Sequence, residues 1–114
     1  MEKLIPKPLN FWATKSGVEP VRVFLSELDK ADKRKIGLDL RTVQFGWPIG
    51  MPLVRPLGQG LHELRTSLPS KRELRLFFAA NEESITLVHA FIKKTQKTPD
   101  HELKIARSRL KEQK

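Results

Sequence analysis

The sequence contains no cysteine and no tyrosine among its 114 residues. The absence of cysteine excludes disulfide bridges, thiolate nucleophiles and cysteine-based zinc sites. No apolar run approaches the roughly 20 residues of a membrane-spanning helix. The first segment, MEKLIPKPLN, also lacks the apolar core that signal peptides carry. We therefore expect a cytoplasmic protein that does not enter a membrane.

Acidic residues are scarce relative to basic ones, 13 against 22, which gives a formal charge of +9 and a pI of about 10.2. Both halves of the chain carry the basic excess, so the charge belongs to the folded body rather than to a tail. A field of this sign speeds encounters with polyanions and supports binding to nucleic acid. An anionic partner is the first interpretation, and a basic protein without such a partner is the alternative.

Apolar spacing predicts a helical hairpin near the N-terminus. The pair Glu19-Pro20 begins a helix, because proline is tolerated in the first turn of a helix. Apolar residues then recur at i, i+3, i+4 and i+7, at Val21, Phe24, Leu25 and Leu28. A second helix is expected from about Asp32 to Phe45, with Ile36, Leu40 and Val43 on one face. The short join between the two helices predicts that they are antiparallel.

Alternating apolar residues predict the strands. One strand is expected over residues 5–13, before the helices, and three more over residues 61–68, 72–80 and 85–93. WPIGMP, between the second helix and these strands, is expected to be a loop. Short turns between consecutive strands imply antiparallel pairing. A short C-terminal helix is expected to follow, capped by Thr98 with Pro99 in its first turn. The order β-α-α-β-β-β-α predicts one α+β domain over residues 1–114 with a mainly antiparallel sheet.

Cations gather where the last predicted strand ends, in the segment HAFIKKTQKTP. Side chains alternate across a strand, so one face of this strand is expected to present Ile85, Leu87, His89, Phe91 and Lys93. The two preceding strands have mixed faces that include Arg65 and Arg75. Provided that these faces align, one concavity receives four side chains and has two more at its rim. The four are Arg65, Arg75, His89 and Lys93, and the rim carries Lys94 and Lys97.

Clustered cations of this kind fit a nucleic-acid phosphate. The sequence has no CxxC, HExxH or phosphate-loop motif and only three scattered histidines, so neither a metal nor a cofactor is expected. Glu63 and Glu73 form no obvious acid–base pair. The chemistry left is metal-independent cleavage of RNA, in which the substrate's own 2′-OH attacks. Arginine and lysine would stabilise the charge that develops on the phosphate, and a lysine or histidine would move protons.

Simpler interpretations of the same residues stay open. The three lysines could be a solvated strand end. Arg65 and Arg75 could pair across strands with Glu63 and Glu73. His89 could be a half-buried structural residue.

Several segments resemble the HigB-type, phage-related branch of the RelE/ParE superfamily of type II toxins. They are "GLHELR", "RELRLFF" and "LVHAFIKKTQKTP", followed by a helix that contains "AR"; "EPVRVFLSEL" is similar to the first helix of that branch. The likeness runs from about Asn10 to Arg109. It implies a RelE-like fold and an endoribonuclease that cleaves mRNA on the translating ribosome. It also implies neutralisation by a helix-turn-helix antitoxin.

Carried over to this sequence, the resemblance implies a set of catalytic residues, namely Arg65, Arg75, Lys93, Lys97 and His89. We also expect four residues to bind RNA, namely Lys94, Arg72, Phe91 and Arg107. Some relatives place a tyrosine near the cleaved phosphate or a catalytic histidine at the C-terminus, and this sequence has neither. Phe91 cannot exchange a proton, although it could stack on a base. These departures leave two alternatives: a ParE-like inhibitor of DNA gyrase, and a non-toxic nucleic-acid-binding domain.

Overall fold

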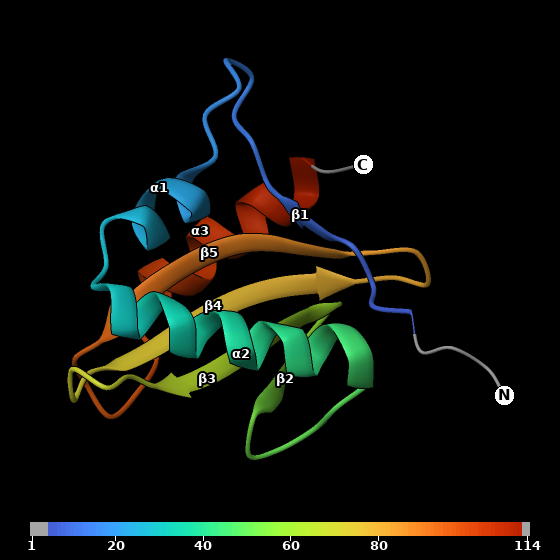
Figure 1. Ribbon diagram of the computed structural model, residues 1–114. Helices are drawn as coiled ribbons and strands as arrows, with labels where there is room; N and C mark the ends of the chain where they lie inside the picture. Colours follow the sequence, from blue (N-terminus) through green and yellow to red (C-terminus); the bar gives the residue numbers. More distant parts are fainter. Residues whose placement is uncertain (1–4, 113–114) are drawn as a thin grey trace, which may run out of the picture.

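One five-stranded sheet runs through the protein, with helices on both of its faces (Figure 1). The computed structural model describes residues 5–112. The elements in chain order are β1 (Leu9–Phe11), α1 (Pro20–Ser26), α2 (Lys30–Gly46), β2 (Val54–Gly58), β3 (Leu61–Ser67), β4 (Glu73–Ala80), β5 (Ile85–Lys93) and α3 (Asp100–Glu112). The strand order is β1-β5-β4-β3-β2, with β1 parallel to β5 and all other neighbours antiparallel. The expected α+β fold is therefore confirmed.

The helical hairpin is present as α1 and α2, and both predicted apolar stripes face the sheet. Val21 of α1 is buried, and the side chains of Phe24, Leu25 and Leu28 pack on the same core. The buried residues of α2 include Ile36, Leu40 and Val43. Periodicity of 3.6 residues therefore located this part of the fold from the sequence.

Two strands differ from the expectation. The strand expected over residues 5–13 is confined to Leu9–Phe11. β2 was not predicted, and it occupies one edge of the sheet. Its Pro56 has no backbone N–H to offer a neighbouring strand, which is tolerated at an edge but not in the middle of a sheet. The proline at this position makes the segment difficult to predict as a strand from the sequence.

The start of α3 also differs from the expectation. Helix α3 begins at Asp100, and the backbone N–H groups of Glu102 and Leu103 donate to the carbonyl of Pro99. Pro99 therefore occupies the capping position that was assigned to Thr98. The Thr98 hydroxyl instead donates to Glu63 Oε2 at 3.3 Å. This contact ties the loop after β5 to β3.

Each face of the sheet has its own apolar cluster. The larger cluster lies under α1 and α2 and includes Leu64, Leu74, Leu76, Phe78, Ile85 and Leu87. The smaller cluster lies under α3 and consists of Leu61, Phe77, Val88, Phe91 and Ala106, with Trp12, Leu57, Leu103 and Leu110 around it. The α3 side therefore supplies much less of the core.

A β-bulge in β5 corrects the predicted face of that strand. Phe77 of β4 pairs with His89, whereas Phe78 pairs with Leu87, so Val88 is an extra residue. An inserted residue reverses the alternation of side chains. Consequently Leu87 packs in the larger cluster, while Phe91 packs in the smaller one with Val88. The expectation that Ile85, Leu87, His89, Phe91 and Lys93 share one face was wrong.

No helix within residues 5–112 combines the length and the hydropathy that crossing a membrane requires.

Candidate functional site

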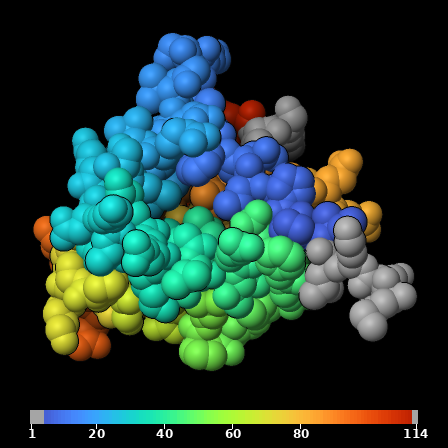
Figure 2. All heavy atoms as spheres, viewed as in Figure 1, coloured from blue at the N-terminus to red at the C-terminus, as the bar shows by residue number. Residues whose placement is uncertain are grey.

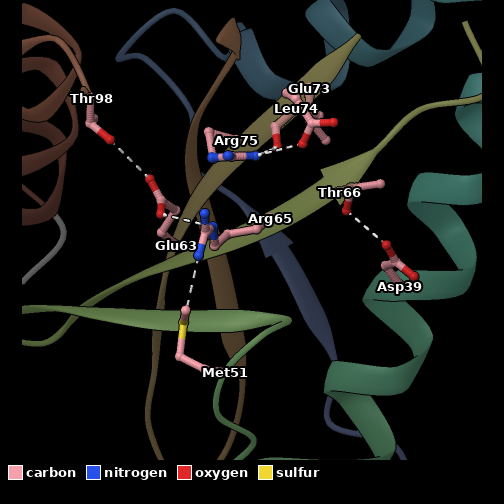
Figure 3. A network of polar contacts seen from close by, with 9 residues as sticks. All are labelled: Asp39, Met51, Glu63, Arg65, Thr66, Glu73, Leu74, Arg75 and Thr98. Atoms are coloured by element: carbon pink, nitrogen blue, oxygen red, sulfur yellow. Dashed lines mark hydrogen bonds and ion pairs between the residues drawn. The ribbon is translucent and has the colours of Figure 1, made fainter. Parts of the chain in front are cut away.

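Two arginines face each other across the sheet on the side of α3. Arg65 of β3 and Arg75 of β4 are direct cross-strand partners, and Arg75 is in turn opposite Phe91 of β5. Figure 3 shows both side chains together with Glu63. Like charges placed directly opposite each other destabilise a sheet. The fold therefore keeps two positive charges opposite each other at this position, and a bound anion would reduce the repulsion between them.

Arg75 is the more buried of the two arginines, with only 5% of its surface exposed. Its Nη1 donates to the carbonyl of Leu74 at 3.0 Å and to Glu73 Oε1 at 3.4 Å. Its buried Nε donates to no acceptor among residues 5–112. A buried N–H without an acceptor is costly, so Arg75 is held in place with one donor still to be satisfied.

Arg65 is half-buried and only loosely held. Its Nε lies 3.9 Å from Glu63 Oε1, and its Nη1 lies 3.8 Å from the sulfur of Met51 (Figure 3). The sequence left open that each arginine pairs with a glutamate. Such pairs do exist, but within one strand, at two residues' separation, rather than across strands.

Glu63 is a carboxylate with 1% of its surface exposed, and it connects two hollows. The first hollow, of about 380 Å³, is lined by Arg65, Arg75, Glu73, Lys35 and Asp39, among others. We call it the arginine hollow. The second, of about 350 Å³, is lined by Arg55, Leu57, Gln96, Lys97, Thr98 and others. Glu63 contacts Arg65 in the first hollow and Thr98 in the second.

The lysine-rich segment follows directly from β5. Lys93 is the last residue of that strand and is opposite Glu73, whereas Lys94 and Lys97 are exposed in the following loop. Within residues 5–112, none of these three lysines forms an ion pair. The Thr95 hydroxyl donates to the carbonyl of Lys97 at 2.7 Å, which shapes the loop. Three cations are therefore free to meet an anion, one at the end of β5 and two in the loop after it, where Lys97 lines the second hollow.

His89 lies apart from the arginine hollow, in a link between β5 and α3. Its Nε2 is 2.6 Å from Glu102 Oε1, and Nη1 of Arg109 is 3.4 Å from its Nδ1. Burial lowers the pKa of His89, although the hydrogen bond to Glu102 and the charge of that carboxylate act in the opposite direction. A neutral imidazole that donates from Nε2 and accepts at Nδ1 satisfies both contacts. Both ring nitrogens are thus already engaged.

Three of the four residues expected to bind RNA have other contacts. Phe91 is buried and packs edge-on against Phe77, with ring centroids 5.4 Å apart. Arg72 bonds to Asp32 and Ser70. Arg107 donates to the carbonyl of Leu57 at 2.8 Å and also contacts Gly58 and Gln59, so it braces the β2–β3 turn. Lys94 is the exception, since no described residue bonds to its side chain.

Sequence reasoning missed Arg55, Lys35 and Asp39 as lining residues of the two hollows. Arg55 belongs to the strand that was not predicted. Lys35 and Asp39 belong to α2 but not to its predicted apolar stripe, and they form an ion pair with each other at 3.1 Å. Asp39 also accepts from the Thr66 hydroxyl of β3 at 2.9 Å (Figure 3), which draws that side of α2 to the sheet. No pattern in the sequence marks these three residues as lining the two hollows.

Metal ligands are the remaining possibility for a site. Within residues 5–112, no three His, Asp or Glu side chains lie close enough together to hold a metal ion.

Comparison with known protein families identifies the group to which the sequence belongs. A family model described as phage-derived protein Gp49-like (DUF891) matches residues 23–111, which is most of the chain. The chain belongs to the Gp49-like family. Gp49-like proteins are toxin-like members of the RelE/HigB superfamily in toxin–antitoxin systems, and such a family implies an antitoxin as a partner. A comparison with curated protein sequences gives no match.

Proposed function

We propose that this Gp49-like protein is a HigB-type toxin that cleaves mRNA on the translating ribosome in the cytoplasm. The proposal includes a helix-turn-helix antitoxin as its partner. The observation that carries it is the facing pair Arg65 and Arg75, one of which keeps a buried N–H without an acceptor among residues 5–112. A phosphodiester supplies the negative charge and the acceptor oxygens that this pair lacks.

In this proposal the scissile phosphate enters the arginine hollow. Hydrogen bonds from Nη1 to the Leu74 carbonyl and to Glu73 hold Arg75 in place. Its guanidinium therefore needs little reorganisation when negative charge develops on the phosphate. Arg65 is loosely held and closes on the phosphate from the neighbouring strand. Attack of the 2′-OH on phosphorus breaks the bond to the 5′-oxygen and leaves a 2′,3′-cyclic phosphate and a 5′-OH.

The reaction requires one group to remove the 2′-OH proton and another to protonate the leaving 5′-oxygen. Lys93 and Lys97 are our candidates. Lys93 ends the strand that pairs with the strand of Arg75, and Lys97 lines the second hollow, which Glu63 connects to the first. Neither lysine has an acidic partner within residues 5–112. Lys94 would contact the phosphate backbone nearby. We assign His89 a positioning role, since its contacts with Glu102 and Arg109 hold α3 against β5.

Mapping of RNA 5′ ends after a short pulse of expression tests the proposal. The wild type should produce new 5′ ends within coding sequences, and Arg65→Ala should abolish both these ends and growth arrest. Arg34→Ala is the matched control, because Arg34 is an exposed arginine on α2 with no ion pair to a described residue. It should behave like the wild type. Intact RNA together with a DNA-damage response would replace the proposal with gyrase inhibition.

A further inference from the structure

Gly37 stands in the middle of α2, where glycine costs a helix about 1 kcal/mol relative to alanine. Its φ lies outside the left-handed region, so the backbone does not require glycine. A Cβ placed at this position would meet no atom within 4 Å among the described residues. Nothing in the described fold explains the missing side chain. A helix surface without a Cβ does allow another backbone to approach closely.

Gly37 lies in the wall of a groove of about 350 Å³ between α1, α2 and β1. The other lining is largely apolar and includes Phe11, Leu25, Ile36 and Leu40. Figure 2 shows the side of the molecule on which α1 and α2 form the surface. Apolar surface gathered in this way is typical of a protein-binding site.

Cations surround Gly37 on the helix. Lys33 and Arg34 lie one turn before it and Arg41 lies one turn after it, and residues three or four apart are neighbours on a helix surface. In the part of the chain that the structure describes, none of these three cations forms an ion pair. Arg22 of α1, which also lines the groove, pairs with Glu19. The α2 side of the rim is therefore basic and unneutralised, which favours a partner of opposite charge.

The geometry points to this groove as the docking site of an acidic amphipathic helix from a partner protein. Apolar side chains of that helix fill the groove, its backbone passes closest at Gly37, and its carboxylates face Lys33, Arg34 and Arg41. The assignment of this partner as the antitoxin rests on the proposed function. Since the opposite side of α2 lines the arginine hollow, the docked helix leaves Arg65 and Arg75 uncovered.

A displayed library of helical peptides tests this inference and needs no purified partner. Each peptide carries a fixed leucine stripe at helical spacing and random Glu, Lys or Gln at all other positions. Selection on the wild-type protein should enrich glutamate. The selected peptides should bind Gly37→Met at least about tenfold more weakly than the wild type, which corresponds to about 1.4 kcal/mol. The larger side chain fills the groove while the open space around Gly37 accommodates it.

Control variants distinguish binding at the groove from effects of added bulk or of misfolding. Ala31→Met adds similar bulk at an exposed position in the first turn of α2 and should leave binding unchanged. The double variant Lys33→Glu, Arg34→Glu reverses the rim charge without touching the apolar lining, and it should also lose binding. This second test holds even where Gly37→Met folds poorly.

The inference is overturned when no peptide is enriched, when lysine is enriched, or when Gly37→Met binds as tightly as the wild type. It is also overturned when Arg65→Gln abolishes binding, because the peptides then occupy the arginine hollow. RNA cleavage by Gly37→Met is measured separately and should be retained. Acidic peptides that bind at the groove of a protein without any RNA cleavage would contradict the proposed function alone.

Discussion

The two faces of the sheet differ in what covers them. Under α1 and α2 the strands present leucine, isoleucine, valine and phenylalanine, and the apolar cluster there extends over most of the face. Under α3 the apolar cluster has only five buried members within residues 5–112, and next to it come Glu63, Arg65 and Arg75. One face therefore provides stability, whereas the other holds charges that the hydrophobic effect would not place there. Charges kept at such a cost indicate a function for the second face.

The largest effect on stability is expected on the apolar face. Phe78 is fully buried and contacts the rings of Trp47 and His62. Phe78→Ala should lower the free energy of unfolding by about 3–5 kcal/mol, because it removes buried surface and leaves a cavity. Denaturant titration followed by circular dichroism measures this change. A loss below about 1 kcal/mol would contradict the division of roles between the two faces.

Arg75, on the other face, is expected to matter for RNA cleavage and not for stability. Arg75→Met removes a buried charge and its repulsion from Arg65 while keeping apolar bulk. Stability should therefore be unchanged or should rise by about 1 kcal/mol. RNA cleavage should fall by a factor of about 100 or more, as is usual when a preorganised donor to the transition state is lost.

Thermal unfolding and a cleavage assay on the same Arg75→Met preparation check this prediction. A variant that is both strongly destabilised and inactive would assign Arg75 a structural role. Arg22→Met serves as the control, since Arg22 is an exposed arginine that packs over the ring of Phe11. That control should keep full cleavage activity.

Acid should weaken the link between β5 and α3. Burial lowers the pKa of His89 below its usual value of 6.5, so the unfolded chain binds a proton at a higher pH than the folded protein does. Stability should therefore fall as the pH decreases below about 6.5. His89→Gln should reduce this pH dependence in thermal unfolding between pH 7 and 5. His62, whose pKa is also lowered by burial, should supply the part that persists. An unchanged pH profile in His89→Gln would contradict this assignment.

The smallest effect is a gain in stability in α2. Gly37→Ala should raise the free energy of unfolding by about 0.5–1 kcal/mol, because alanine has the higher helix propensity and the added methyl group meets open space. A rise in the melting temperature measures it. A destabilised variant would show that the described fold does require glycine at this position.

Parts of the fold that depend on local patterns were predictable from the sequence. The stripe from Val21 to Leu28 and the stripe of Ile36, Leu40 and Val43 follow a helical period, and both helices formed as expected. Strand β2 was missed because Pro56 reads as a break in any strand except one at an edge. The bulge at Val88 has no mark in the sequence, because it arises from how β5 pairs with β4.

The candidate site was predictable in its residue types but not in its geometry. The segment around Lys93 and the pattern HELR contain residues that the structure places in or next to the two hollows. Only strand register places Arg65 opposite Arg75, and register depends on contacts between distant parts of the chain. The same applies to His89, which a one-residue bulge and Glu102 of α3 place in a link between elements.

Binding of RNA with methylated 2′-hydroxyls, measured over a range of salt concentrations, tests the central claim most directly. Methylation prevents cleavage, so the measurement reports binding without turnover, and the variants assign the part of it that the arginine hollow contributes. Arg65→Ala and Arg75→Met should each weaken binding at least about tenfold and lower the salt slope by about 1, whereas Arg34→Ala should change neither. Equal losses in all three variants, or wild-type binding by Arg65→Ala and Arg75→Met, would contradict the account.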